Sequence, residues 1–260
     1  MKIHFYKYQG TGNDFVILDN RNWSYSALDM EKVKFLCDRR FGIGADGLML
    51  LNPATGYDFE MKYYNADGRE SSLCGNGGRC MVKFAHHLGM IKSRYSFLAA
   101  DGPHEAEIED DGTVNLKMQD VKEIKEYRSD FILDTGSPHY VKIVSDVMDY
   151  DVFHRGMDIR YSAEFAKEGI NVNFVEPKKG DEIIVRTYER GVEDETFSCG
   201  TGVTASALVC HHNDVGYNDV TVVTKGGRLV VKYDRINDGM FQNIWLCGPA
   251  ERVYEGDITV

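Results

Sequence analysis

Two cysteines in this chain share one local pattern, in which glycine, a polar residue and a second glycine follow the thiol. The strings are Cys74-Gly75-Asn76-Gly77 and Cys199-Gly200-Thr201-Gly202, and a stretch of helical period follows each. A thiol at the start of a helix lies near unpaired backbone N–H groups and the positive end of the helix dipole, which both favour the thiolate. The pattern predicts two activated thiols, one in each half of the chain.

Two such thiols suit the movement of a proton on and off a carbon from opposite faces. One thiolate removes the α-proton of an amino acid, and the other thiol delivers a proton on the far side, which inverts the centre. Helix N-termini rich in glycine can hold the α-carboxylate as its charge grows. We expect no cofactor, because the chemistry needs none and the sequence has no strand-linked G-x-G-x-x-G, P-loop or marked pyridoxal lysine.

The other cysteines fit simpler roles. Cys37, Cys210 and Cys247 lie among apolar residues, as buried small hydrophobes do. Six cysteines in 260 residues are too few for a disulfide scaffold. Cys74 and Cys80 are too far apart for the usual zinc hook, and no second hook exists. We therefore expect no metal.

Composition and charge limit the possible partners. The chain is 43% hydrophobic, as a globular protein is, and its net charge of −11 is spread along the sequence. That distribution argues against nucleic acid and anionic membranes, which attract clustered Lys and Arg. Residues 1–8 mix charged with apolar side chains, and no run approaches the roughly 18 apolar residues of a membrane span. We expect a cytoplasmic protein without a signal peptide.

Short strands separated by turns account for most of the sequence. Alternation around Ile3 and Phe5 and along Phe59–Tyr63 predicts strands, as do the β-branched runs Val220–Val223 and Leu229–Val231. Turn signals stand at Asp67-Gly68, Asp111-Gly112, Gly226-Gly227 and Asp238-Gly239. Helical period is clearest in three segments: a stripe of Met30, Val33 and Cys37, a run from Gly77 to Leu88, and a run from Thr201 to about His212 with Val203, Ala207 and Cys210 on one face.

The order of elements repeats in the two halves of the chain. Each half has strands, then the cysteine string, then one apolar helix, then more strands, which is typical of two related lobes. We predict an α+β fold of two pseudo-symmetric lobes, each a mostly antiparallel β-sheet or barrel wrapped around a central helix. The charged stretch 121–130, where Lys and Glu replace the strand pattern, marks the predicted boundary between the lobes.

Several strings, in order from Lys2 to about Ile258, resemble the diaminopimelate epimerase family. They are Gly12–Phe15, Tyr64–Gly68, Cys74–Cys80, Thr135–His139, Asn171–Phe174 and Arg186–Gly191 leading to Cys199–Gly202. The resemblance implies a cofactor-independent epimerase that converts LL-2,6-diaminopimelate to the meso form in lysine and peptidoglycan precursor synthesis. It also implies that residues 1–124 with 248–260 form the lobe of Cys74, that residues 125–247 form the lobe of Cys199, and that the active site lies in the cleft between them. The lobes would close over the substrate, and the protein would be a homodimer.

The resemblance carries residue roles onto matching positions. Cys74 and Cys199 become the acid–base pair. Backbone N–H groups of four residues would bind the reacting carboxylate: Gly75, Asn76, Gly200 and Thr201. Asn65 and Glu189 would bind the reacting ammonium, and the distal amino acid end would be bound by Asn13, Asn171 and Arg190. His139 and Glu189 would tune the protonation of the cysteines. Without that context, Asn13 is a turn residue, Glu189-Arg190 a solvated pair and His139 a turn cap.

Two positions depart from the family pattern. Ser137 stands where the family usually has asparagine, and Gly47 stands where some members carry a substrate-contacting glutamine. Neither touches the chemical step, so the expected change is in recognition of the distal end.

Other protein classes could carry parts of the pattern. Proline racemases use paired cysteines, but with a Cys-Gly-His-Gly type first string where this chain has Asn76. Isomerases of the phenazine-biosynthesis type lack the cysteine pair. A module that only binds an amino acid would gain nothing from two thiols, and its binding would survive their replacement by alanine.

Overall fold

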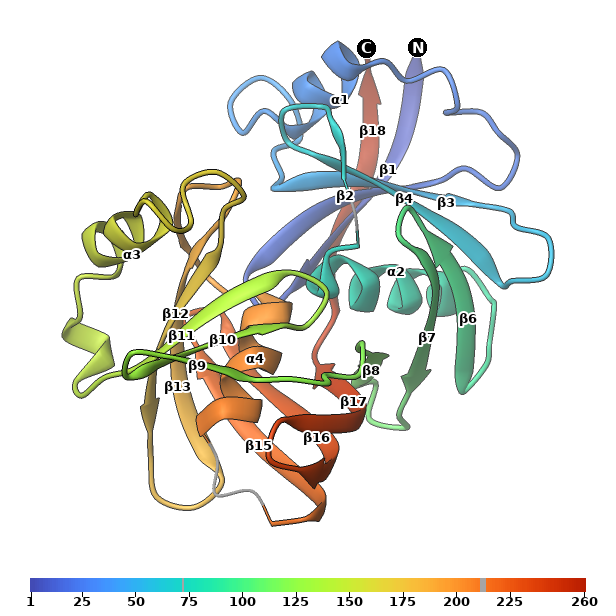
Figure 1. Ribbon diagram of the computed structural model, residues 1–260. Helices are drawn as coiled ribbons and strands as arrows, with labels where there is room; N and C mark the ends of the chain where they lie inside the picture. Colours follow the sequence, from blue (N-terminus) through green and yellow to red (C-terminus); the bar gives the residue numbers. More distant parts are fainter. Residues whose placement is uncertain (72, 211–213) are drawn as a thin grey trace. The chain divides into compact units, whose positions relative to one another are not determined.

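The computed structural model describes residues 1–71, 73–210 and 214–260. The chain divides into two compact units, one of residues Met1–Leu116 with Gly248–Val260, and one of Lys117–Cys247. Strands predominate in both units (Figure 1). Within the part of the chain that the structure describes, no helix combines the length and apolar character needed to cross a bilayer.

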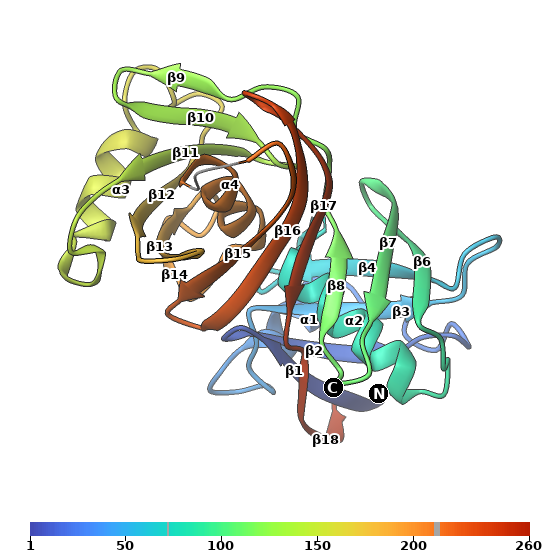
Figure 2. The same cartoon turned by 90° about the horizontal axis from the view of Figure 1, so that it is seen from below.

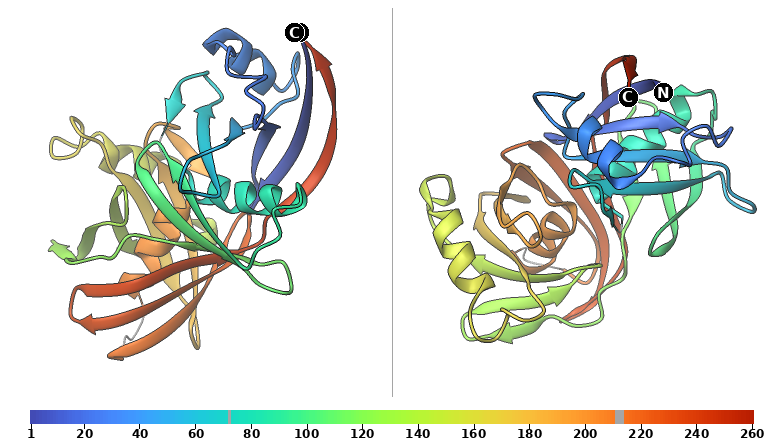
Figure 3. Two further views of the ribbon diagram at one scale, coloured as in Figure 1. Left: turned by 90° about the vertical axis from the view of Figure 1, so that its right-hand side faces the viewer. Right: turned by 90° about the horizontal axis from the view of Figure 1, so that it is seen from above.

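The first unit is a continuous series of paired strands with two helices. Its elements are β1 (Lys2–Gly10), β2 (Asn13–Asp19), α1 (Met30–Cys37), β3 (Gly47–Asn52), β4 (Phe59–Asn65), β5 (Glu70–Ser71), α2 (Gly75–His87), β6 (Arg94–Ala99), β7 (Gly102–Ile108), β8 (Val114–Lys117) and β18 (Glu251–Thr259). β1 pairs with β18 along its length, so the two ends of the chain lie side by side (Figure 3).

The second unit contains the remaining elements. They are β9 (Lys125–Tyr127), β10 (Asp130–Asp134), β11 (Pro138–Ile143), a short 3-10 helix (Val147–Asp149), α3 (Val152–Arg160), β12 (Asn171–Pro177), β13 (Glu182–Glu189), β14 (Asp194–Thr196), α4 (Gly200–Cys210), β15 (Gly216–Thr224), β16 (Gly227–Asn237) and β17 (Met240–Gly248).

The two units repeat one pattern of strand pairing. In the first, β1–β2 is antiparallel, β2–β3 parallel, β3–β4 antiparallel, β4–β6 parallel and β6–β7–β8 antiparallel. In the second, β10–β11 is antiparallel, β11–β12 parallel, β12–β13 antiparallel, β13–β15 parallel and β15–β16–β17 antiparallel. In each unit one helix precedes the third strand of the series (α1 before β3, α3 before β12). Another helix precedes the fifth strand (α2 before β6, α4 before β15). This repetition confirms the predicted pseudo-symmetry.

A helix occupies the concave side of each sheet. α2 packs against β1, β2, β3 and β7, and α4 packs against β10, β11, β12, β13, β15 and β16. Figure 2 shows α4 enclosed by the strands of its own unit. Such a helix is buried nearly all round, so small residues such as Gly77, Gly78, Ala205 and Ala207 fill much of its surface.

Three details of the predicted helices differ from the structure. Met30, the first residue of α1 after the capping residue Asp29, is half exposed, and the buried stripe consists of Val33, Leu36 and Cys37. α4 has no single apolar face, since it is buried on all sides from Gly202 to Leu208. The predicted continuation of this helix to His212 lies outside the described residues. α3 was not predicted at all.

α3 depends on a glycine at its contact with β13. A Cβ added at Gly156 would stand 2.6 Å from Tyr188 Cγ, closer than side chains pack. We expect Gly156→Ala to lower the free energy of unfolding by about 1–3 kcal/mol, because overpacking outweighs the better helix propensity of alanine. Urea unfolding measures the change, with Arg155→Ala on the exposed side of α3 as control. A Gly156→Ala protein more stable than the parent would contradict this packing.

Candidate active site

Cys74 is the residue directly before α2. Its backbone is extended (φ −95°, ψ 123°), and the helix begins at Gly75. The first turn lies tightly against the sheet, because a Cβ added at Gly77 would stand 3.1 Å from Met49 Sδ and 3.3 Å from Met61 Cε. The strands thus hold the thiol at the N-terminus of a buried helix, where the first backbone N–H groups have no partner within the helix.

Asn13 at the start of β2 is one hydrogen-bond partner of this thiol. Its Oδ1 lies 3.5 Å from Cys74 Sγ and accepts the thiol hydrogen. Its Nδ2 donates to Asp46 Oδ2 at 2.5 Å. Because a carboxylate only accepts hydrogen bonds, Asp46 determines which way the amide points and turns its oxygen towards the sulfur.

A charged network holds Asp46 in turn. Asp14 and Asp46 each accept a hydrogen bond from the other's backbone N–H, and Arg39 binds both carboxylates at 2.6 and 2.7 Å. Lys7, nearly fully buried, lies 2.7 Å from Asp14. Burial raises the pKa of the Asp14 carboxyl, but hydrogen bonds from Arg39 and Lys7 outweigh it and lower the pKa to about 2.

The first turn of α2 also contacts a buried arginine. Arg79 is fully buried, and its Nη2 donates to Thr11 Oγ1 at 2.8 Å and to Asn76 Oδ1 at 2.9 Å. Thr11 has a left-handed backbone (φ 54°) in the turn between β1 and β2. The guanidinium therefore ties the helix start to the turn that carries Asn13.

The other two positions singled out in this unit lie where β3 meets β4. Gly47 and Asn65 are register partners. The side chain of Asn65 is exposed, and its backbone carbonyl accepts a hydrogen bond from Gly68 N, which closes a turn. A Cβ at Gly47 would stand 2.5 Å from Tyr63 Cε2 and 2.6 Å from Tyr64 O. The space that a longer residue would need is thus already filled by Tyr63.

Cys199 holds the same place in the second unit, directly before α4. It is 8% exposed, and its Sγ lies 3.5 Å from Thr201 Oγ1. The Thr201 carbonyl accepts a hydrogen bond from Thr135 Oγ1 at 2.9 Å, which fastens the first helical turn to the end of β10. Both cysteines therefore occupy equivalent positions in the repeated topology.

Asn171, Arg190 and Ser137 form one hydrogen-bonded group. Asn171 Nδ2 donates to Ser137 Oγ at 2.9 Å, and Arg190 Nη2 donates to the same oxygen at 3.3 Å. Arg190 N donates to Asn171 Oδ1 at 2.9 Å. Ser137 is thus the acceptor that joins the two other side chains.

His139 is fully buried on β11, whereas Glu189 is half-buried at the end of β13. His139 Nδ1 lies 3.1 Å from Asn173 Nδ2. Burial, and to a smaller extent the positive charge of Arg190, lower the pKa of His139 to about 3. The imidazole is therefore neutral at physiological pH. The Glu189 carbonyl accepts from Glu193 N at 2.8 Å.

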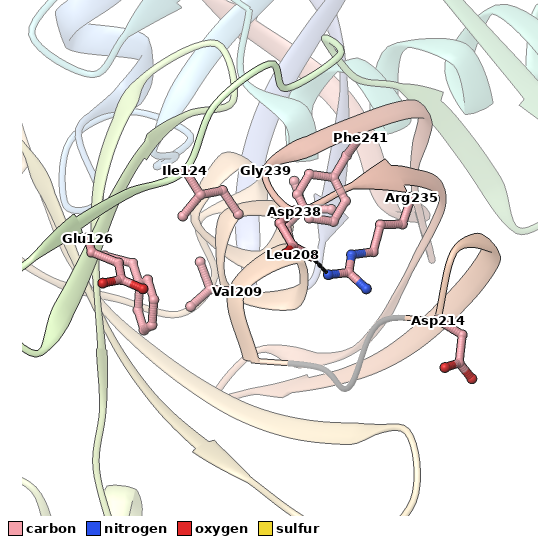
Figure 4. A pocket seen from close by; sticks show the side chains of 10 residues that line it. Ile124, Glu126, Leu208, Val209, Asp214, Arg235, Asp238, Gly239 and Phe241 are labelled. Carbon is pink, nitrogen blue, oxygen red and sulfur yellow. Dashed lines mark hydrogen bonds and ion pairs between the residues drawn. The ribbon is translucent and has the colours of Figure 1, made fainter.

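A hollow of about 650 Å³ lies at the other end of α4 (Figure 4). Leu208, Val209, Ile124 and Phe241 provide its apolar wall, with Arg235 paired to Asp238 at its edge. None of the predicted site residues lines it. Among the described residues, no group of three or more His, Cys, Asp or Glu side chains is placed to hold a metal ion.

Sequence reasoning missed the residues that support the predicted ones. Arg79 and Asn173 stand inside the strings that resemble the family, and Asp46 stands directly before Gly47, yet nothing in one sequence tells which residues they contact. Their signal was polarity in otherwise buried segments: Arg79 and Asn173 are both fully buried. Buried polar groups need partners, so each indicates a local hydrogen-bond network.

Comparison with known proteins gives consistent matches. The family model for diaminopimelate epimerase matches residues 5–124 and 131–253. A diaminopimelate epimerase from Flavobacterium psychrophilum is 46% identical, over 98% of this chain and 100% of that protein. Another from Chlorobaculum tepidum is 41% identical, over 96% of this chain and 99% of that protein.

Solved structures share the fold at much lower identity. A phenazine biosynthesis protein of the PhzF family from Bacillus anthracis has a TM-score of 0.77 at 14% identity, over 100% of both chains. A hydroxyproline epimerase from Agrobacterium vitis has a TM-score of 0.71 at 13% identity, over 99% of this chain and 92% of that chain. These likenesses confirm the predicted fold class.

Asp14 links the charged network to stability. Because its pKa is lower in the folded protein, the network's contribution is present above about pH 4 and is lost as pH falls towards 2. We expect Asp14→Asn to lower the free energy of unfolding by about 2 kcal/mol at pH 7. The difference in free energy of unfolding between Asp14→Asn and the parent protein should shrink between pH 4 and pH 2.5, as measured by urea unfolding. Exposed Asp110→Asn is the control, and a gap that stays constant with pH would contradict this role.

Proposed function

Because the chain belongs to the diaminopimelate epimerase family, we propose that Cys74 and Cys199 are the acid–base pair of its reaction. The chain is accordingly an isomerase of lysine biosynthesis with diaminopimelate epimerase activity. One observation carries the assignment of the pair: each thiol stands directly before the buried helix of its unit, at the same point of a repeated topology.

The proposed reaction inverts one α-carbon of LL-diaminopimelate and yields the meso isomer. A thiolate takes the α-proton and becomes a thiol, and the electron pair left on carbon delocalises into the α-carboxylate. The opposite thiol then protonates the other face and becomes a thiolate. Protons and charge balance over the step, and no electron acceptor is consumed. The reverse reaction exchanges the roles of the two cysteines.

Backbone groups of both helix starts would stabilise the intermediate. N–H groups of Gly75, Asn76, Gly200 and Thr201 belong to first helical turns, which offer donors to an anion. They would bind the reacting carboxylate as its negative charge grows, which is where preorganised donors lower the barrier most. Asn65 and Glu189 would bind the reacting ammonium.

The distal amino acid end needs acceptors for an ammonium and a cation for a carboxylate, because an unpaired buried charge is costly. Asn13, Asn171 and Arg190 are proposed for this task. Hydrogen bonds among Asn171, Arg190 and Ser137 support it, since they hold a guanidinium and an amide together before substrate arrives. Ser137 is the shorter substitute for asparagine in this group.

Further parts of the proposal rest on the resemblance. We infer that the two compact units are the two catalytic lobes, and that His139 with Glu189 tunes the cysteines. Supply of peptidoglycan precursors, a homodimer and a cytoplasmic location stay predictions.

Removing either thiol tests the two-cysteine reaction. We expect Cys74→Ala and Cys199→Ala each to lower epimerisation of LL-diaminopimelate by at least about a hundredfold, because each removes one proton-transfer group. The assay follows the meso isomer and α-deuterium in D₂O under reducing conditions without added cofactor. Cys210→Ala, at the far end of α4, is the matched control and should keep full activity. A single alanine variant with more than about a tenth of the parent activity would disprove the pair.

Ser137 tests distal recognition separately from chemistry. We expect Ser137→Ala to raise KM roughly two- to tenfold, the worth of one hydrogen bond, with kcat nearly unchanged. Steady-state kinetics on LL-diaminopimelate measure both constants, and exposed Ser145→Ala serves as control. A fall in kcat at constant KM would instead place Ser137 in the chemical step.

A further inference from the structure

His139 belongs to a buried hydrogen-bond chain whose proton positions can be deduced. Asn173 on β12 is fully buried, and its Nδ2 lies 3.1 Å from the Tyr140 carbonyl oxygen and 3.1 Å from His139 Nδ1. A backbone carbonyl only accepts, so the amide nitrogen of Asn173, not its oxygen, must face Tyr140. The Asn173 oxygen accepts from Thr187 Oγ1 at 2.9 Å, which agrees with this orientation.

That orientation determines the tautomer of the histidine. The second hydrogen of Asn173 Nδ2 points at His139 Nδ1, so Nδ1 must offer a lone pair. An imidazole that is neutral and accepts at Nδ1 carries its hydrogen on Nε2. Doubly protonated imidazole would set two N–H groups against each other and is disfavoured.

The remaining nitrogen has no acceptor in the described part of the chain. His139 Nε2 is buried and lacks a hydrogen-bond partner there. A buried donor without an acceptor is costly and needs an explanation. The ring lies against the start of α4, because a Cβ added at Gly202 would collide with the Asn173 oxygen and stand 3.4 Å from His139 Cε1. Cε1 is bonded to Nε2, and Gly202 is three residues after Cys199.

We propose that Asn173 is a positioning residue that keeps His139 as the neutral Nε2–H tautomer, so that His139 donates a hydrogen bond to an anion formed at the start of α4. This inference rests on the proposed function, in which the Cys199 thiolate is that anion. His139 then stabilises the thiolate as a fixed donor and does not remove a proton as a base. Nothing in this role consumes or releases a proton.

The tautomer can be measured without any assay of activity. Two-bond ¹⁵N–¹H spectra of protein labelled at histidine distinguish the two ring nitrogens, and loss of one signal set in His139→Gln assigns His139. The expected spectrum at neutral pH shows hydrogen on Nε2 and a lone pair on Nδ1. Hydrogen on Nδ1, or on both nitrogens, would overturn the proposal. Because this result does not depend on turnover, it stays readable even if the proposed reaction is wrong.

An isosteric variant tests whether Asn173 sets the tautomer. In Asn173→Asp the carboxylate can only accept, so we expect hydrogen to move onto His139 Nδ1 and kcat to fall at least tenfold. Thr187→Val, which removes the neighbouring hydroxyl but leaves the amide donors, is the matched control and should retain hydrogen on Nε2. An unchanged ring spectrum in folded Asn173→Asp would overturn the positioning role. A moved hydrogen with unchanged kcat would overturn the donor role. If Asn173→Asp does not fold, the spectrum of the parent protein still decides the tautomer.

Discussion

The N-termini of α2 and α4 each pack closely against the strands of their own unit, and the positions of both cysteines depend on this constraint. A helix on the concave side of a curved sheet has no solvent face, so its first turn must be small and its start must be tied down. Gly77 against Met49 and Gly202 against Asn173 leave no room for a Cβ without a shift. The glycines that follow each cysteine are thus required by packing as well as by access to backbone N–H groups.

Side-chain amides around the cysteines are oriented by partners that can play only one hydrogen-bonding role. Asp46 accepts from Asn13, and the Tyr140 carbonyl accepts from Asn173. An amide can turn over at little cost when its partners are ambiguous, whereas a carboxylate or carbonyl removes that freedom. Such partners preorganise a site before substrate binds, which matters most for a reaction that relies on small shifts of protonation.

Sequence reasoning reached the repeated order of elements because two local signals agreed. The cysteine strings and the helical runs behind them recur in each half, and the turn glycines Gly68, Gly112 and Gly239 all adopt positive φ. α3 was not predicted from the sequence because Val152 and Gly156 are its only buried residues, so it lacks the apolar stripe by which a helix is recognised. Its position depends on a tertiary contact with Tyr188. Likewise, the pairing of Asn13 with Asp46 joins residues far apart in sequence, and periodicity contains no information on it.

The two halves share geometry but differ in charge. Arg79 and Thr204 both stand five residues after their cysteine, both are fully buried, and both donate to the carbonyl of the residue after that cysteine. One is a permanent cation and the other a neutral hydroxyl. A buried charge in a medium of low dielectric acts over a longer range than a hydroxyl dipole. Equivalent positions therefore place the two thiols in unequal fields, although the backbone around them repeats. An enzyme whose substrate has one reacting end and one distal end has no need for identical halves, and this difference is built into the first turns of α2 and α4.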